Sequence, residues 1–149
     1  MKIIHYIFIS ILLISCLWSC SGTRRTVKEH QKFFPTEINK VYLGMSLNQL
    51  KSVRNTNTLS VDPGKKITYA FETFIDKDFS KINYQFDENQ ILYEIIITFN
   101  KNIDIFHQFE KEYGQSNSKK EWLFENIDNL NLKIWVYENR LCIGIQKYF

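Results

Sequence analysis

Alternation of apolar with mostly polar residues is the feature that most constrains this chain. In residues 82–86, 91–99, 132–136 and 141–145, every second residue is apolar. A period of two is typical of strands with one buried face. Composition agrees, because the 149 residues include 12 Phe, 8 Tyr and 3 Trp but only one Ala, which favours a sheet over a helix bundle.

Each group of strands follows a segment with helical spacing. Ser46 is a good N-cap for a helix over 46–54, and 103–113 predicts a second helix that Gly114 ends. A polar loop is expected at 55–66, and a tight hairpin connection at 87–90. The expected strands are 67–71, 82–86 and 91–99 in the first half, and 122–124, 132–136 and 141–145 in the second.

The two halves therefore repeat one order of elements. Residues 86–91 match 136–141 at an offset of 50, and the two helices match at an offset of 56. We expect an α+β fold: a tandem α-β-β-β repeat forming one antiparallel sheet of about six strands with two helices on one face. The domain would span 38–149, with repeats at 38–100 and 101–149.

The N-terminus predicts export and lipid attachment. Lys2 precedes an apolar stretch of about twelve residues, too short to span a bilayer but suited to a signal peptide. Leu13-Ile14-Ser15-Cys16 and Leu17-Trp18-Ser19-Cys20 both resemble the bacterial lipobox, in which the Cys becomes acylated. Cys16 fits better, because Ile14 is a usual residue at its position. The alternatives are Cys20, a plain signal peptide or a single anchor helix.

Residues 1–20 are thus read as signal peptide and lipobox, and 21–37 as a polar linker that holds the domain off the membrane. Neither candidate Cys is followed by Asp, which resembles an outer-membrane address in Gram-negative bacteria. We expect a lipid-anchored protein on the periplasmic face of the outer membrane. The net charge of +3 is too small for a nucleic-acid footprint.

The segment around Gly44, Met45, Ser46 and Leu50 resembles the SmpA/BamE-like lipoproteins. In that family a Gly-Met-Thr/Ser motif opens a helix with polar residues and an apolar anchor. The resemblance implies an N-terminal lipid and a small α+β fold like that of the beta-lactamase inhibitor protein. It covers the signal, about thirteen residues of motif and the element order. This chain departs from the outer-membrane assembly factor of the family in having two repeats.

Sequence patterns for catalysis or metal binding are missing. There is no Cys-x-x-Cys, no His-x-x-x-His and no Gly-rich phosphate loop. His107 is expected to be solvated on the second helix, and Cys142 to act as a small hydrophobe on a strand. We therefore expect no enzyme activity, no cofactor and no metal, with a hydrolase of unrecognised site as a remote alternative.

The outward side of the predicted sheet is the more informative feature. Aromatic residues with charged neighbours on a solvent-facing sheet are typical of protein interfaces. The alternatives are that the tail 146–149 covers this side, or that a curled sheet buries both sides. The predicted outward residues are Lys133, Trp135, Tyr137, Leu92, Glu94, Ile96 and Cys142, of which all but Cys142 form the candidate binding set.

The resulting hypothesis is a non-catalytic, membrane-anchored module that binds an envelope or secreted protein. Its role would be that of an assembly scaffold or of an inhibitor or immunity protein. The alternative is a carrier that holds a small apolar ligand between helices and sheet.

Overall fold

The computed structural model describes residues 28–117 and 119–149. The predicted signal peptide and both candidate acylation sites, Cys16 and Cys20, lie outside these residues. Among the described residues, no helix is both long and apolar enough to cross a membrane.

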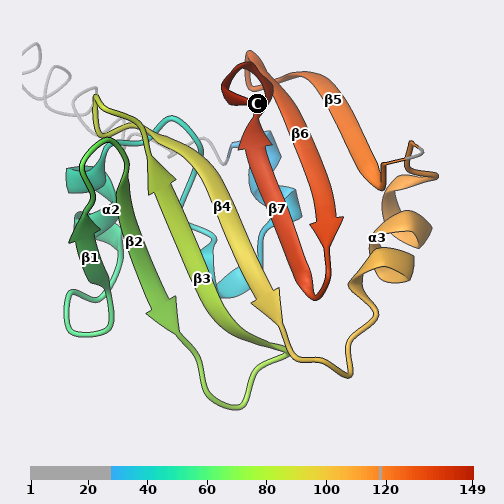
Figure 1. Ribbon diagram of the computed structural model, residues 1–149, viewed down its shortest axis with the longest axis horizontal. Coiled ribbons are helices and arrows are strands. Elements are labelled where there is room, and N and C mark those ends of the chain that lie inside the picture. Colours follow the sequence, from blue (N-terminus) through green and yellow to red (C-terminus); the bar gives the residue numbers. More distant parts are fainter. Residues whose placement is uncertain (1–27, 118) are drawn as a thin grey trace, which may run out of the picture.

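One antiparallel sheet of seven strands dominates the domain, in the order β1-β2-β3-β4-β7-β6-β5 (Figure 1). The elements, with η denoting a 3-10 helix, are η1 (Glu29–Phe33), η2 (Thr36–Ile38), α2 (Leu47–Val53), β1 (Ser60–Pro63), β2 (Thr68–Thr73), β3 (Phe79–Phe86), β4 (Leu92–Phe99), α3 (Ile105–Tyr113), β5 (Glu121–Ile127), β6 (Leu130–Tyr137), β7 (Arg140–Ile145) and η3 (Gln146–Tyr148).

The predicted α+β fold is confirmed. Among the described residues, the α-helix α3 is followed directly by the meander β5 to β7, and the α-helix α2 is followed by β1 and then by the meander β2 to β4. The third strands of the two meanders, β4 and β7, pair at the centre of the sheet. One strand was not expected: β1 lies within the predicted polar loop 55–66. It is exposed at all four positions, so it has no apolar alternation by which to recognise it.

Local capping explains where the helices begin and end. The Ser46 hydroxyl accepts the N–H of Gln49, and the Gln49 side chain accepts the N–H of Ser46, which closes a capping box at α2. Asp104 caps α3 by accepting the N–H of His107. Gly114 ends α3 with φ of 88°, a backbone conformation that favours glycine.

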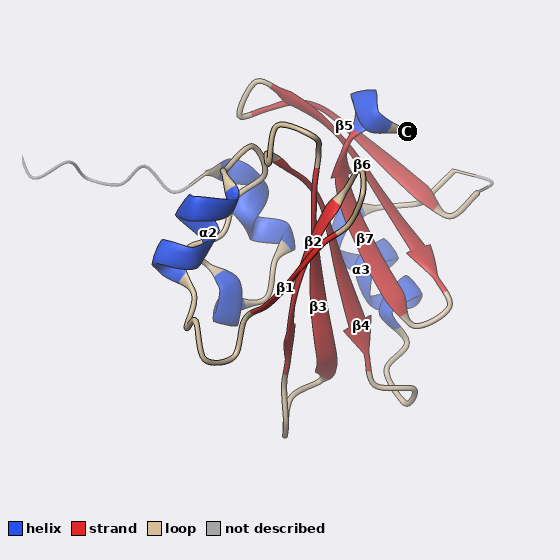
Figure 2. Cartoon of the chain, turned by 60° about the vertical axis from the view of Figure 1, so that its left-hand side comes forward, coloured by secondary structure: helices blue, strands red, loops and turns tan. Residues whose placement is uncertain are grey.

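The core lies between the helices and one face of the sheet, which we call the core face (Figure 2). Leu47 and Leu50 of α2 and Ile105 and Phe109 of α3 pack into it. The largest fully buried side chains that strands contribute to this face are Ile82, Tyr84, Phe86, Leu92, Ile95, Ile97, Leu132, Ile134 and Ile143.

The prediction of a polar linker over 21–37 is wrong for residues 29–37, which fold as part of the domain. Residues 29–33 form η1, and His30, Phe33 and Phe34 are buried. The ring of Phe33 lies 4.8 Å from that of Phe124 and 5.0 Å from that of Tyr113. The segment is too short to show a hydrophobic period, although its apolar residues pack as part of the core.

His30 fastens this segment to both repeats. Its Nε2 accepts the backbone N–H of Leu43 at 2.9 Å. Its Nδ1 lies 2.6 Å from Oδ2 of Asp128, which belongs to the β5–β6 turn. The two atoms are close, but they are not aligned as donor and acceptor of a hydrogen bond. Burial lowers the pKa of His30 and outweighs the opposing effect of Asp128. The imidazole is therefore held neutral, with Nε2 as an acceptor.

A buried ion pair fixes the other half of the core face. Glu72 accepts hydrogen bonds from Nε of Arg54 and from the hydroxyl of Tyr84, both at 2.8 Å. Nη1 of Arg54 donates to the carbonyl of Glu37 at 2.6 Å, so the charge also holds η2 in place. Desolvation and the neighbouring carboxylate raise the pKa of Tyr84, which keeps its hydroxyl a donor.

Acid should weaken the domain through His30. Because the folded-state pKa lies below the ordinary 6.5, the unfolded chain binds the proton more tightly, and the free energy of unfolding falls as pH drops below 6.5. His30→Leu should remove this part of the pH dependence and lower stability at neutral pH by about 1–3 kcal/mol, since Leu43 loses its acceptor. Urea denaturation across pH measures both effects.

His107→Leu is the matched control, because the side chain of His107 is 76% exposed. It leaves His30 and the contacts of His30 in place, so the loss of stability below pH 6.5 that His30 causes should remain. Equal pH dependence of wild type and His30→Leu would contradict the role of His30.

Candidate functional site

The second face of the sheet, turned away from α2 and α3, carries the predicted binding residues, and we call it the outer face. The strand register places Gln85, Glu94, Gly144 and Lys133 in one row across β3, β4, β7 and β6. The next row contains Asn83, Ile96, Cys142 and Trp135.

Five of the six predicted binding residues lie on the outer face: Lys133, Trp135, Tyr137, Glu94 and Ile96. Tyr137 is 58% exposed, while Lys133, Trp135 and Ile96 are half-buried. Glu94 is only 5% exposed. The outer face is therefore open around Tyr137 and covered around Glu94.

Leu92 is a correction, because it is fully buried in the core. A bulge causes the difference: Phe86 pairs with Leu92, whereas the adjacent Gln85 pairs with Glu94. The extra residue shifts the alternation, so Leu92 turns to the core face. Tyr93 instead reaches the outer face, where its hydroxyl donates to Oε1 of Gln85 at 2.8 Å.

The C-terminal tail, residues 146–149, covers the part of the outer face around Glu94. Tyr148 stacks on Tyr93 with ring centroids 4.8 Å apart, and its hydroxyl donates to Asp87 at 2.8 Å. Phe149 meets the indole of Trp135 edge-on, also at 4.8 Å. Of the alternatives that the sequence left open, closure by the tail therefore holds for this part of the face.

Glu94 is the electrostatic anomaly of the outer face. None of the described residues donates a hydrogen bond to its carboxylate or forms an ion pair with it. Burial raises its pKa to about 7, so the group changes charge near neutral pH.

Cations lie over aromatic rings at several points of this face. Nζ of Lys81 is 4.3 Å from the ring centroid of Phe71, and Nζ of Lys133 is 5.3 Å from that of Trp135. The guanidinium of Arg140 lies 5.9 Å from the centroid of Tyr137. Aromatic residues and Arg are enriched in protein interfaces.

The motif at Gly44, Met45, Ser46 and Leu50 serves the fold. Gly44 has φ of 87° and donates its N–H to the carbonyl of Leu92. Met45 and Leu50 are fully buried, and the carbonyl of Met45 accepts the N–H of Leu92. The motif therefore docks the first helix onto the start of β4.

The two residues considered for catalysis lie on different parts of the fold. His107 is exposed on α3, with Nδ1 2.7 Å from Oδ2 of Asp104. Cys142 is buried on the outer face, and burial raises the pKa of its thiol to about 12, so it packs as a small hydrophobe. Within 28–117 and 119–149, no group of three or more His, Cys, Asp or Glu residues could hold a metal ion.

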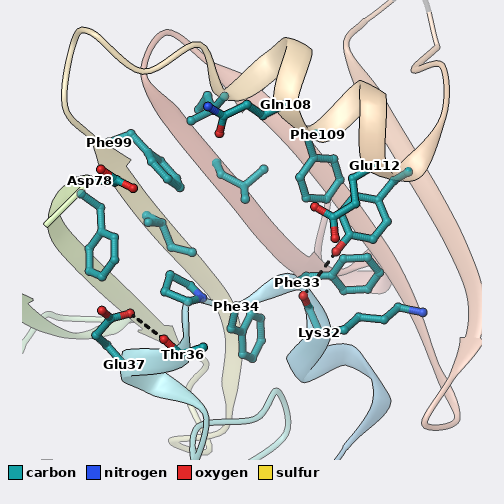
Figure 3. A pocket seen from close by; sticks show the side chains of 16 residues that line it. Lys32, Phe33, Phe34, Thr36, Glu37, Asp78, Phe99, Gln108, Phe109 and Glu112 are labelled. Atoms are coloured by element: carbon teal, nitrogen blue, oxygen red, sulfur yellow. Dashed lines mark hydrogen bonds between the residues drawn. The ribbon is translucent and has the colours of Figure 1, made fainter.

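A cavity of about 420 Å³ lies over the core face, between α3 and the segment 32–37 (Figure 3). Its floor includes Ile97, Phe79 and Phe109, all of them buried. Asp78 and Glu112 belong to its polar lining. Its volume suits a small molecule, but its floor offers little exposed apolar surface to one.

Comparison with known proteins leaves the family open. The chain matches no family model, and searches of curated proteins and of solved structures find no match either. The resemblance to the SmpA/BamE-like lipoproteins therefore stays a prediction.

Sequence reasoning missed several residues of the site. Tyr93 was absent from the predicted outward residues, and Gly144 was not considered. A glycine inside a strand marks a close approach by another group, and here that group is Phe149. Gly144 was thus the sequence signal that the tail packs on the outer face.

Alkaline pH should weaken the fold around Glu94. Its folded-state pKa exceeds the ordinary 4.5, so the free energy of unfolding falls as pH rises from 4.5 through about 7. Glu94→Gln removes this fall, and at about pH 8 it should exceed wild-type stability by about 1–3 kcal/mol. Near pH 4.5 the two proteins should be equally stable in urea denaturation.

Glu125→Gln, at an exposed position of β5, is the matched control and should show no such gain. A Glu94→Gln protein that gains nothing at alkaline pH would contradict the burial of a titrating carboxyl.

Proposed function

We propose that this chain is a non-catalytic, lipid-anchored protein of the bacterial envelope that binds another protein through its outer face. The observation that carries the proposal is an antiparallel sheet with helices on one face and aromatic side chains on the other. Tyr137 and Leu123 are 58% and 55% exposed, and Trp135 lies beside them half-buried. Exposed aromatic residues near charged groups are the usual anchors of protein interfaces.

The cation–aromatic pairs add to this support. Lys133 is held between Trp135 and Glu121, with an Nζ to Oε1 distance of 2.9 Å. Arg140 lies over Tyr137 on the neighbouring strand. These charged groups are positioned before a partner arrives, which lowers the ordering cost of binding.

An interface at this face would suit an assembly scaffold or an inhibitor, and both belong to the proposal. The small-ligand carrier has less support, because the floor residues of the cavity over the core face are themselves buried and offer a ligand little exposed apolar surface.

Photo-crosslinking in cells tests the binding face. A photoreactive residue at position 137 should capture a partner that mass spectrometry identifies as one envelope or secreted protein. A probe at Lys51, exposed on α2, is the control and should not capture it. Trp135→Ala should reduce the capture at least about fivefold, since an interface anchor contributes more than 1 kcal/mol.

The proposal fails at this face if position 137 captures nothing from a folded protein. It also fails if Lys51 captures the same protein equally well.

Metabolic labelling with a palmitate analogue tests the anchor. The wild-type chain should carry the label. Because a single thiol carries the acyl group, one of the two variants, Cys16→Ala or Cys20→Ala, should abolish the label and the other should keep it. Label that persists in the double variant, or a wild-type chain that is never labelled, would contradict lipidation. Tyr69→Ala, an outer-face variant on β2, should label like wild type.

A further inference from the structure

Gly144 leaves a notch in the middle of the outer face. It lies between Glu94 of β4 and Lys133 of β6 in one row of the sheet, and it has no side chain to fill its place. Neighbouring strands are about 4.8 Å apart, so the flanking side chains stand nearly 10 Å from each other. Tyr93 and Trp135 complete the surroundings, and we call this space the Gly144 notch.

The ring of Phe149 fills the notch. A Cβ placed on Gly144 would lie 2.5 Å from Cε2 and 2.7 Å from Cζ of that ring, so no other residue would leave it in place. Phe149 also lies 4.8 Å from the indole of Trp135 and 6.0 Å from Nζ of Lys133. The notch is therefore shaped for a flat aromatic side chain.

The tail that delivers this ring is lightly held. Phe149 remains 52% exposed, and η3 has no buried residue. Its backbone bonds stay within the tail, where the N–H of Phe149 meets the carbonyl of Gln146 at 3.2 Å. Stacking on Tyr93 and the Tyr148–Asp87 hydrogen bond are its further ties to the domain.

We propose that the Gly144 notch binds an aromatic side chain of a protein partner, and that Phe149 occupies it in the free protein as an intramolecular competitor. This inference rests on the proposed function, since it assigns the central subsite of the same outer face. The carboxylate of Glu94 flanks the notch without a donor among the described residues. A partner that presents an N–H beside its aromatic ring would supply one.

A peptide competition experiment tests the notch. The probe is the acetylated peptide Gln-Lys-Tyr-Phe, which has the sequence of residues 146–149. It is added to the full-length Phe149→Ala protein, and the Trp135 indole and Gly144 amide signals are followed by NMR. The probe should saturate the variant and bind wild type at least tenfold more weakly. The control peptide Gln-Lys-Tyr-Ala should not bind.

A Cβ in the notch provides the second arm. Gly144→Ala in the Phe149→Ala background should abolish probe binding, because the methyl group occupies the place of the ring. If this double variant does not fold, Trp135→Ala in the same background replaces it, with Tyr69→Ala as the matched outer-face control. The proposal would be overturned if wild type and Phe149→Ala bound the probe equally well. It would also be overturned if Gly144→Ala in the Phe149→Ala background bound the probe as well as Phe149→Ala alone.

The outcome separates this inference from the proposed function. If position 137 captures its partner while the probe shows no competition with Phe149, the notch is wrong and the outer-face function stands. If the probe competes with Phe149 and position 137 captures nothing, the notch binds aromatic side chains and the proposed binding of an envelope or secreted protein through the outer face is wrong.

Discussion

The pairing of β4 with β7 is the contact on which the rest of the domain depends. It joins the two repeats through five residue pairs, from Glu94–Gly144 to Thr98–Arg140. Asn139 extends the junction, since its carbonyl accepts the N–H of Phe99 and its side chain donates to the Phe99 carbonyl. Without this β4–β7 pairing, which we call the seam, each repeat would be a three- or four-stranded ribbon with one helix. Ile95 and Ile97 of β4, and Leu141 and Ile143 of β7, would then lie on open sheet edges.

The seam also explains why both faces have their present character. On the core face it brings together Ile95 and Ile97 with Leu141 and Ile143, which the two helices then cover. On the outer face it places Glu94 directly beside Gly144, so that an acid and a gap meet at the centre of the sheet. The same pairing therefore produces the most apolar and the most unusual parts of the molecule.

Much of the fold was predictable because its determinants are local. Sequence patterns marked six of the seven strands, four of them by apolar alternation, and capping residues such as Ser46 and Gly114 marked helix ends. The remainder depends on contacts between distant residues. A one-residue bulge turns Leu92 inward, and only the paired register of β3 and β4 reveals it.

Burial of polar groups was equally invisible in the sequence. His30 lies in a polar stretch, and its partners Leu43 and Asp128 are 13 and 98 residues away. Glu72 likewise has the spacing of a core residue, but only the fold supplies Arg54 and Tyr84 to it. In the candidate site, position on the face was predictable for most residues, whereas coverage by the tail was only one of several alternatives until the contact of Phe149 with Gly144 was known.

The folded N-terminal segment has a mechanical consequence. It runs along the core face, opposite the outer face, so a tether at the N-terminus and a partner on the outer face would pull on opposite sides of one sheet. Such tension would first load η1, held by Phe33 and by the His30 contacts, before it reached the strands. From Cys16 to residue 28 the chain runs twelve residues, and from Cys20 it runs eight, which is at most about 42 Å and about 28 Å when fully extended. A lipid anchor at either cysteine would keep the domain within that distance of the membrane, and its partner would approach from the far side.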